Sequence, residues 1–361
     1  MTNGFVRTIA NGCVLAVLFA SSADAQSATF RAASTYSLPG LNTDATSIMV
    51  VTDVGSLAGA LDGIPDVVVG AQNQQVAVLY GRADGRLVGG PNTQLGRIPT
   101  AIALAEFNGA TGIDMLVADT GSNLLCFQGF PDGPPWVRQG DSIIVGDTPV
   151  AIATHDFNDD GLMDVAVLHE GNGTIGAVWI LYATGSCSFA APPFPRDATV
   201  ETGAGSNAIV IGDFDGDGNP DFAVTNGIGN DLSIILGDDE GSYTEVQRIS
   251  VAAGAAQLVE PVGIKAGRFN GDDIEDLVVV NRNADQIALL IGRADGTFAA
   301  PRFFPSGSSG SSPTSIAVGD VDVDGNLDVV VANNRSSDAS LLRGDGQGNL
   351  AAPRVFMADQ E

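Results

Sequence analysis

The sequence predicts an all-β fold in which a four-stranded antiparallel sheet is repeated. Three observations predict it. A segment rich in Asp and Gly recurs, and alignment of its first position at Glu106, Asp156, Asp213, Arg268 and Asp320 gives spacings of 50 to 57 residues. Short apolar runs bounded by turn residues flank the copies, as expected for short strands. No segment of the body keeps a 3.6-residue period, so helices are not expected.

Composition excludes several classes of protein. The chain has 361 residues and a formal net charge of −27, from 43 acidic and 16 basic residues, yet 44% of it is hydrophobic. Disorder requires high charge together with low hydrophobicity, and the second condition fails. Nucleic acid and anionic membrane surfaces would repel so acidic a protein. Hard cations such as Ca²⁺ are the natural partners of clustered carboxylates.

The N-terminus has the layout of a cleaved secretory signal peptide. Arg7 precedes an apolar stretch over residues 8–20, and Ala23-Asp24-Ala25 fits a cleavage site. The apolar stretch is too short to span a membrane. We therefore expect residues 1–25 to be removed, residues 26–361 to form the folded body, and the protein to be secreted, periplasmic or on the cell surface.

Each repeat reads as four strands. An apolar run precedes the acidic segment, as in residues 313–320, and a β-branched run follows it, as in residues 328–333. A third apolar run, such as residues 286–292, leads into a Gly/Asp turn and a closing run such as residues 298–304. Period-2 alternation and continuous β-branched runs of this length predict strands.

One four-stranded sheet cannot cover both of its faces, whereas copies stacked around an axis can. The fold class we predict is therefore a β-propeller of four-stranded antiparallel blades, with an open β-solenoid or a string of sandwiches as the rival. Six copies of the acidic segment predict six blades. Residues 29–36 resemble a seventh closing strand, which could add to the last blade and seal the six-blade ring. Seven blades, with one blade assembled from the two ends of the chain, is the alternative.

The acidic loop has the spacing of a calcium site. Oxygen-bearing side chains stand at positions one, three, five and nine, position seven offers a carbonyl, and a glycine at position six permits a sharp turn. An EF-hand would continue into a helix, but here a β-run follows. The three intact copies predict about three Ca²⁺ sites, with these ligands: Asp156, Asn158, Asp160, Leu162 and Asp164; Asp213, Asp215, Asp217, Asn219 and Asp221; and Asp320, Asp322, Asp324, Asn326 and Asp328.

Charge count favours the loops headed by Asp213 and Asp320 as the stronger sites. In the Arg268 copy, the guanidinium is expected to neutralise Asp272 and Asp276 in place of a cation. Whether the first and second copies hold metal stays open.

These units resemble FG-GAP/VCBS repeats, the calcium-loop blades of the integrin α-subunit head and of many exported bacterial proteins. The resemblance rests on Phe107-Asn108-Gly109, Phe269-Asn270-Gly271, the three calcium loops and the Ala-Ala-Pro closing runs. It implies a propeller with its ions on one face. It also implies a role in adhesion, carbohydrate binding or protein docking.

Little else in the sequence points to chemistry. His155 and His169 are interpreted as structural, and no nucleophile elbow or zinc-protease motif is present. Cys126 and Cys187 could pair in an oxidising compartment, although one falls in a predicted strand and the other in a turn. The triplet Arg343-Gly344-Asp345 is read as a turn.

We therefore expect an exported calcium-binding module that adheres to a glycan or a protein, with no catalytic residues and no enzymatic activity. A polysaccharide-active lyase or hydrolase is one alternative, and a structural subunit of a surface assembly is another. Extracellular glycan or protein is the expected partner, and neither nucleic acid nor membrane insertion is expected. Ligand identity and oligomeric state stay open.

Overall fold

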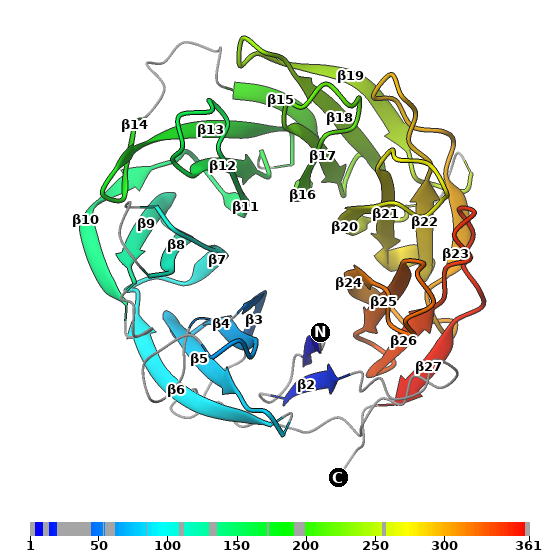
Figure 1. Cartoon of the computed structure of the whole chain (residues 1–361), viewed down its shortest axis with the longest axis horizontal. Helices are drawn as coiled ribbons and strands as arrows, with labels where there is room; N and C mark the ends of the chain where they lie inside the picture. Colours follow the sequence, from blue (N-terminus) through cyan, green and yellow to red (C-terminus); the bar gives the residue numbers. More distant parts are fainter. Residues whose placement is uncertain are drawn as a thin grey trace.

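Six blades surround a central axis in the computed structural model of the chain (Figure 1). The structure describes residues 4–9, 14–19, 45–52, 54, 62–84, 86–107, 112–129, 136–171, 173–190, 199–254 and 258–357. Each blade is an antiparallel sheet, and a single 3₁₀ turn, η1 (Arg282–Ala284), is the one helical element in these residues. The predicted all-β propeller is confirmed, with six blades and not seven.

Four consecutive strands build most blades. The first three blades contain β3 (Ala45–Thr52), β4 (Asp66–Ala71), β5 (Gln75–Gly81) and β6 (Leu87–Gln94); β7 (Pro99–Ala105), β8 (Asp114–Asp119), β9 (Asn123–Gln128) and β10 (Val137–Ile144); and β11 (Pro149–His155), β12 (Asp164–His169), β13 (Ile175–Gly185), β14 (Ser188–Ala190) and β15 (Thr199–Ala204). In the third blade β14 and β15 both pair with β13, so they share its outer edge.

The fourth to sixth blades follow the same plan without a divided outer strand. They contain β16 (Ser206–Gly212), β17 (Asp221–Asn226), β18 (Asp231–Gly237) and β19 (Tyr243–Ser250); β20 (Pro261–Gly267), β21 (Asp276–Asn281), β22 (Gln286–Leu290) and β23 (Arg302–Pro305); and β24 (Pro313–Gly319), β25 (Asp328–Asn333), β26 (Asp338–Leu342) and β27 (Arg354–Met357).

Antiparallel order divides the connections between two faces. In each blade the first-to-second and third-to-fourth connections lie at one end of the sheet, because successive strands reverse direction. We call this end the acidic-loop face, since every acidic segment is a first-to-second connection. The second-to-third connections and the links between blades lie on the opposite face.

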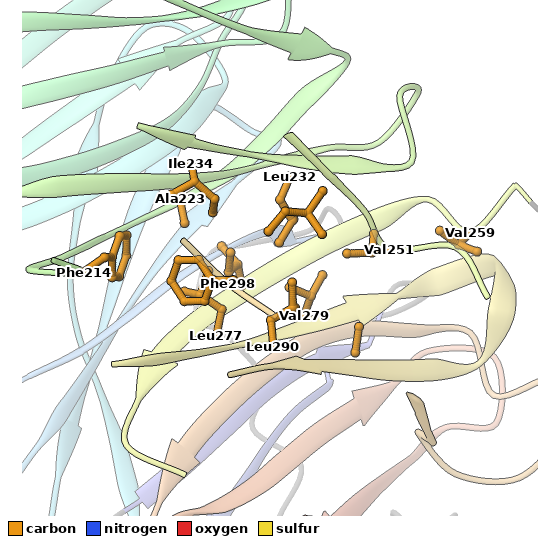
Figure 2. Close-up of a cluster of buried hydrophobic side chains, with 13 residues drawn as sticks. Phe214, Ala223, Leu232, Ile234, Val251, Val259, Leu277, Val279, Leu290 and Phe298 are labelled. Carbon is orange, nitrogen blue, oxygen red and sulfur yellow. The ribbon is translucent and has the colours of Figure 1, made fainter. Parts of the chain in front are cut away.

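The second strand of each blade carries the core. All residues of β4, β8, β12, β17 and β21 are buried, because a blade between two neighbours has no solvent-facing side there. Burying one Val or Leu side chain contributes about 1.5–3 kcal/mol. Figure 2 shows the resulting cluster between the fourth and fifth blades, where Phe214 and Leu232 meet Leu277 and Phe298. Apolar packing between blades therefore holds the ring together.

Cys126 and Cys187 form a disulfide between adjacent blades. Cys126 lies in β9 of the second blade, and Cys187 lies in the turn between β13 and β14 of the third. Their Cα atoms are 5.9 Å apart, and both side chains belong to the apolar cluster between these blades. The structure thus resolves the pairing that the sequence left open.

The N-terminal segment contributes a separate hairpin. Strands β1 (Gly4–Ile9) and β2 (Val14–Phe19) pair with each other, and β2 lies between the first and sixth blades in Figure 1. The predicted closing strand over residues 29–36 and the cleavage site after Ala25 lie outside the described residues. No helix in the described part of the chain has the length and hydropathy of a membrane span.

Candidate metal centres

The acidic loops are held in one register. In the second to sixth blades, the residue before loop position one pairs across the sheet with the aspartate at position nine, as Gly212 pairs with Asp221 and Gly319 with Asp328. Eight residues therefore connect the first and second strands of these blades. The predicted glycine turns are confirmed, because Gly161, Gly218 and Gly325 have φ of 85°, 92° and 93°.

Three carboxylates converge in the fourth blade. Asp213, Asp215 and Asp221 each place one oxygen within 4.8 Å of the others. Calcium binds oxygen at about 2.3–2.6 Å, so two oxygens on one ion can lie as much as roughly 5 Å apart. None of the three pairs with Lys or Arg among the described residues. This donor set fits a hard divalent cation.

The carboxylate at loop position five, Asp217, neighbours Asp215 but does not belong to the three-acid cluster. The Asp217 carboxylate accepts hydrogen bonds from the backbone N–H and the side-chain amide of Asn219, at 2.8 and 2.9 Å. These bonds lower the pKa of Asp217. The Asn219 amide also donates to Asp239 in the turn after β18. Of the five ligands predicted for this loop, the structure gathers the carboxylates at positions one, three and nine.

The sixth blade repeats the cluster with one addition. Asp320, Asp322 and Asp328 bring their oxygens within the same 4.8 Å. Here Nε of Arg343 lies 3.1 Å from Oδ2 of Asp322, while Oδ1 of Asp322 is buried without a hydrogen-bond partner. Asp324 likewise does not belong to the cluster, and it accepts the Asn326 N–H at 2.8 Å. A buried carboxylate oxygen without a hydrogen-bond partner costs free energy, and a bound cation would offset that cost.

The third-blade loop does not gather its acids in this way. Asp156 accepts the N–H groups of Asp160 and Gly161, at 3.1 and 2.7 Å, and Asp160 accepts the N–H of Leu162 at 2.8 Å. Among the described residues, Asp156, Asp160 and Asp164 do not form a three-acid cluster. Position three of this loop is Asn158, so three-acid clusters that could hold a metal form in the fourth and sixth blades among the described residues, and not in the third.

The aspartate at position nine has a structural role in all six blades. One of its oxygens accepts the N–H at or near loop position two, and the other accepts the N–H at the end of the third strand. These bonds are 2.6–3.0 Å long. The aspartates are Asp66, Asp114, Asp164, Asp221, Asp276 and Asp328. This role, present with or without intact metal positions, was missed by the sequence reasoning, although its signal was the aspartate shared by every copy.

Burial raises the pKa of these aspartates. Desolvation is the largest cause and raises the pKa of both Asp221 and Asp328 to about 6. The two backbone N–H donors lower it, and the neighbouring loop carboxylates raise it further. Burial also raises the pKa of Asp276. A cation at the fourth or sixth blade would favour the ionised form.

The fifth-blade loop differs from expectation. Nη1 of Arg268 lies 3.3 Å from exposed Asp273, and within the described part of the chain Arg268 forms no ion pair with Asp272 or Asp276. The expected neutralisation of the latter two by Arg268 is thus wrong. Asp276 is satisfied by the N–H groups of Phe269 and Gly292.

A pocket of about 350 Å³ lies on the opposite face, between the third, fourth and fifth blades. Two carboxylates line it, Glu170 and Glu260, and Glu260 is held by Arg282 at 2.8 Å. Exposed Ile228 and Leu258 line it as well, and its remaining lining residues are Gly205, Asn207, Gly227, Asn230 and Asn283. Sequence reasoning missed this pocket because its residues come from connections that carry no recurrent pattern.

Comparison with known proteins identifies the repeats. An FG-GAP-like repeat model matches residues 156–224 and 268–331, which include the acidic loops of the third to sixth blades. The resemblance seen in the sequence is thus confirmed for these segments. A search of curated proteins found no significant match.

Solved structures share the fold at low identity. A protein from Lactobacillus plantarum has a TM-score of 0.68 and 14% identity, over 99% of this chain and 96% of that one. An Agrocybe aegerita lectin that recognises non-reducing terminal N-acetylglucosamine has 0.60 and 15%, over 99% and 90%. The periplasmic gluconolactonase of Pseudomonas aeruginosa has 0.63 and 16%, over 98% and 96%.

The expectation that the chain is not an enzyme needs correction. Structural neighbours include that gluconolactonase and a putative 6-phosphogluconolactonase from Bacteroides fragilis. Two neighbours with this fold are thus described as enzymes or putative enzymes, so the fold does not exclude catalysis. At 14–16% identity these neighbours show the fold alone, and both binding and catalysis are compatible with it.

Proposed function

We propose that this propeller is stabilised by calcium and acts outside the cytoplasm as a binding module for a glycan or a protein. The convergence of Asp213, Asp215 and Asp221 without a basic partner is the observation that carries the calcium part. Two unit charges 4 Å apart repel by about 1 kcal/mol in water, and by more where water is partly excluded. Calcium removes this repulsion and ties the first two strands of the blade together.

Calcium should raise the melting temperature. At free calcium tenfold above the dissociation constant, each occupied site adds about 1.4 kcal/mol to the free energy of unfolding. We expect most of this gain to disappear in the double variant Asp213→Ala, Asp320→Ala, measured as the difference between melts in calcium and in chelator. Asp272→Ala in the fifth-blade loop is the matched control and should keep the gain. A wild-type melt identical in calcium and in chelator would refute the proposal.

Two features support a location outside the cytoplasm. Disulfides persist mainly in oxidising compartments, and Cys126 is paired with Cys187. The N-terminal segment has the layout of a signal peptide. N-terminal sequencing of the exported protein should then start at Gln26.

The pocket on the opposite face is the ligand site we propose. Pockets of about 300–1,000 Å³ with a few polar groups are typical of ligand sites, and this one combines two carboxylates with exposed aliphatic side chains. It also lies away from the acidic loops, so the metal centres can stiffen the scaffold without contacting the ligand.

Binding to an array of surface polysaccharides and exported proteins tests this assignment. Ile228→Asp should abolish capture, because it places a charge at the pocket, where Ile228 is 57% exposed. Ile144→Asp, at a 77% exposed position in β10 of the second blade, is the matched control and should bind normally. Equal capture by both variants would place the ligand elsewhere.

An enzyme acting at the same pocket is the second candidate, because Glu170 and Glu260 both line it. Release of reducing ends or unsaturated sugars from a polysaccharide, or turnover of a sugar lactone, would favour this candidate over a binding module. Loss of that turnover in Glu170→Gln would place the reaction at the pocket. Stable co-purifying partners with neither capture nor turnover would favour a structural subunit.

A further inference from the structure

The metal centre of the sixth blade contains its own positive charge. Nε of Arg343 lies 3.1 Å from Oδ2 of Asp322, the position-three carboxylate of that loop. The Asp322 side chain is 5% exposed, so the pair lies at the edge of the core, whereas Arg343 is 39% exposed and can move into solvent. A guanidinium at this distance forms a charge-assisted hydrogen bond with the carboxylate.

The equivalent position in the fourth blade is apolar. In each blade the position-nine aspartate accepts a backbone N–H at the end of the third strand, and we compare the residue immediately before that donor. It is Arg343 before Gly344 in the sixth blade, and Leu236 before Gly237 in the fourth. Leu236 packs against the apolar cluster between the fourth and fifth blades. The two loops look equal by their acidic residues, but only one of them faces a guanidinium.

The fourth-blade cluster, in contrast, makes no ion pair with a basic side chain among the described residues. Glu275 of the fifth blade packs against Gly212, which immediately precedes the loop, and it lies within electrostatic reach of both Asp213 and the positively charged Arg268. The sixth-blade cluster is therefore partly neutralised by a direct guanidinium contact, whereas the three carboxylates of the fourth-blade cluster have no such contact among the described residues. We expect the cluster without a guanidinium to bind a cation more tightly, because carboxylates that no positive charge neutralises attract the ion more strongly.

We propose that Arg343 is the resident cation of the sixth-blade loop and that calcium must displace it. The inference rests on the proposed calcium function and names how one of its sites is regulated. The fourth-blade site then fills first as calcium rises, and the sixth-blade site fills at a concentration roughly tenfold higher, since a charge-assisted hydrogen bond must be given up. Filling the second site releases the Arg343 guanidinium at the tip between β26 and β27.

Calorimetric calcium titration of single-site variants tests this proposal. Asp320→Ala leaves the fourth-blade site, and Asp213→Ala leaves the sixth. Adding Arg343→Leu to Asp213→Ala should tighten calcium binding about tenfold, because the fourth blade has leucine at this position. Adding Arg343→Lys to Asp213→Ala keeps the positive charge, so calcium binding should stay weak. Arg354→Leu in β27 of the same blade removes one charge away from the loop, and it should tighten binding far less.

The outcomes separate this inference from its premise. Calcium binding in Asp320→Ala, with no change when Arg343→Leu is added to Asp213→Ala, overturns the role of Arg343 and leaves the proposed function intact. Equal tightening by Arg343→Leu and Arg354→Leu also overturns it, because net charge alone would then explain the effect. Absence of calcium binding in every variant overturns the proposed function and this inference with it.

Discussion

Asp276→Ala is expected to lower the free energy of unfolding by about 4 kcal/mol, with or without calcium. Asp276 opens β21 in the fifth blade and accepts two buried backbone N–H groups, from Phe269 at 2.8 Å and Gly292 at 2.9 Å. Each buried donor left unpaired costs about 1–3 kcal/mol. The two bonds join the loop, the second strand and the end of the third, so their loss loosens three segments of the blade.

Chemical denaturation of three variants isolates this role. Asp276→Asn keeps one acceptor oxygen and should lose about half as much stability as Asp276→Ala. Asp272→Ala changes an exposed acid in the same loop and should stay within about 0.5 kcal/mol of the wild type. If Asp276→Ala unfolded like the wild type, the shared aspartate would not hold the blade. A loss seen only in calcium would show that it acts through metal.

Much of this fold was predictable because the same strand pattern recurs in every repeat. Each second strand begins with the shared aspartate and continues in β-branched or apolar residues, a pattern that requires burial on both faces. Residues 328–333 and 276–281 show it plainly, and both are second strands. Blade number followed from counting the aspartates. Strand pairing at the blade edges was less predictable. No local sequence pattern indicates that β14 and β15 both pair with β13.

The acidic clusters were predictable at the level of loops rather than of single side chains. Sequence spacing identified Asp213 and Asp320 as heads of the strongest loops, and both lie in three-acid clusters. Spacing alone could not show that Asp217 turns toward Asn219, because that depends on local hydrogen bonds. The contact between Arg343 and Asp322 was also hidden, since it joins residues 21 positions apart through the fold.

Reduction of the Cys126–Cys187 disulfide is expected to cost about 4 kcal/mol of unfolding free energy. The bond closes a loop with a sequence separation of 61 residues, and the entropy it removes from the unfolded chain gives this magnitude in the chain-entropy model. The place of the disulfide between two blades adds to its stabilising effect. The loop runs from β9 of the second blade to the outer hairpin of the third, so the bond fastens two neighbouring blades where their apolar faces meet.

Denaturant unfolding with and without dithiothreitol measures this cost. The double variant Cys126→Ala, Cys187→Ala should be about as unstable as the reduced wild type and should not respond to the reductant. Replacement by alanine avoids burying a hydroxyl in the cluster that contains both sulfurs. A wild type whose midpoint ignores the reductant, after thiol counting has shown that both cysteines are free, would mean that apolar packing alone holds the second and third blades together.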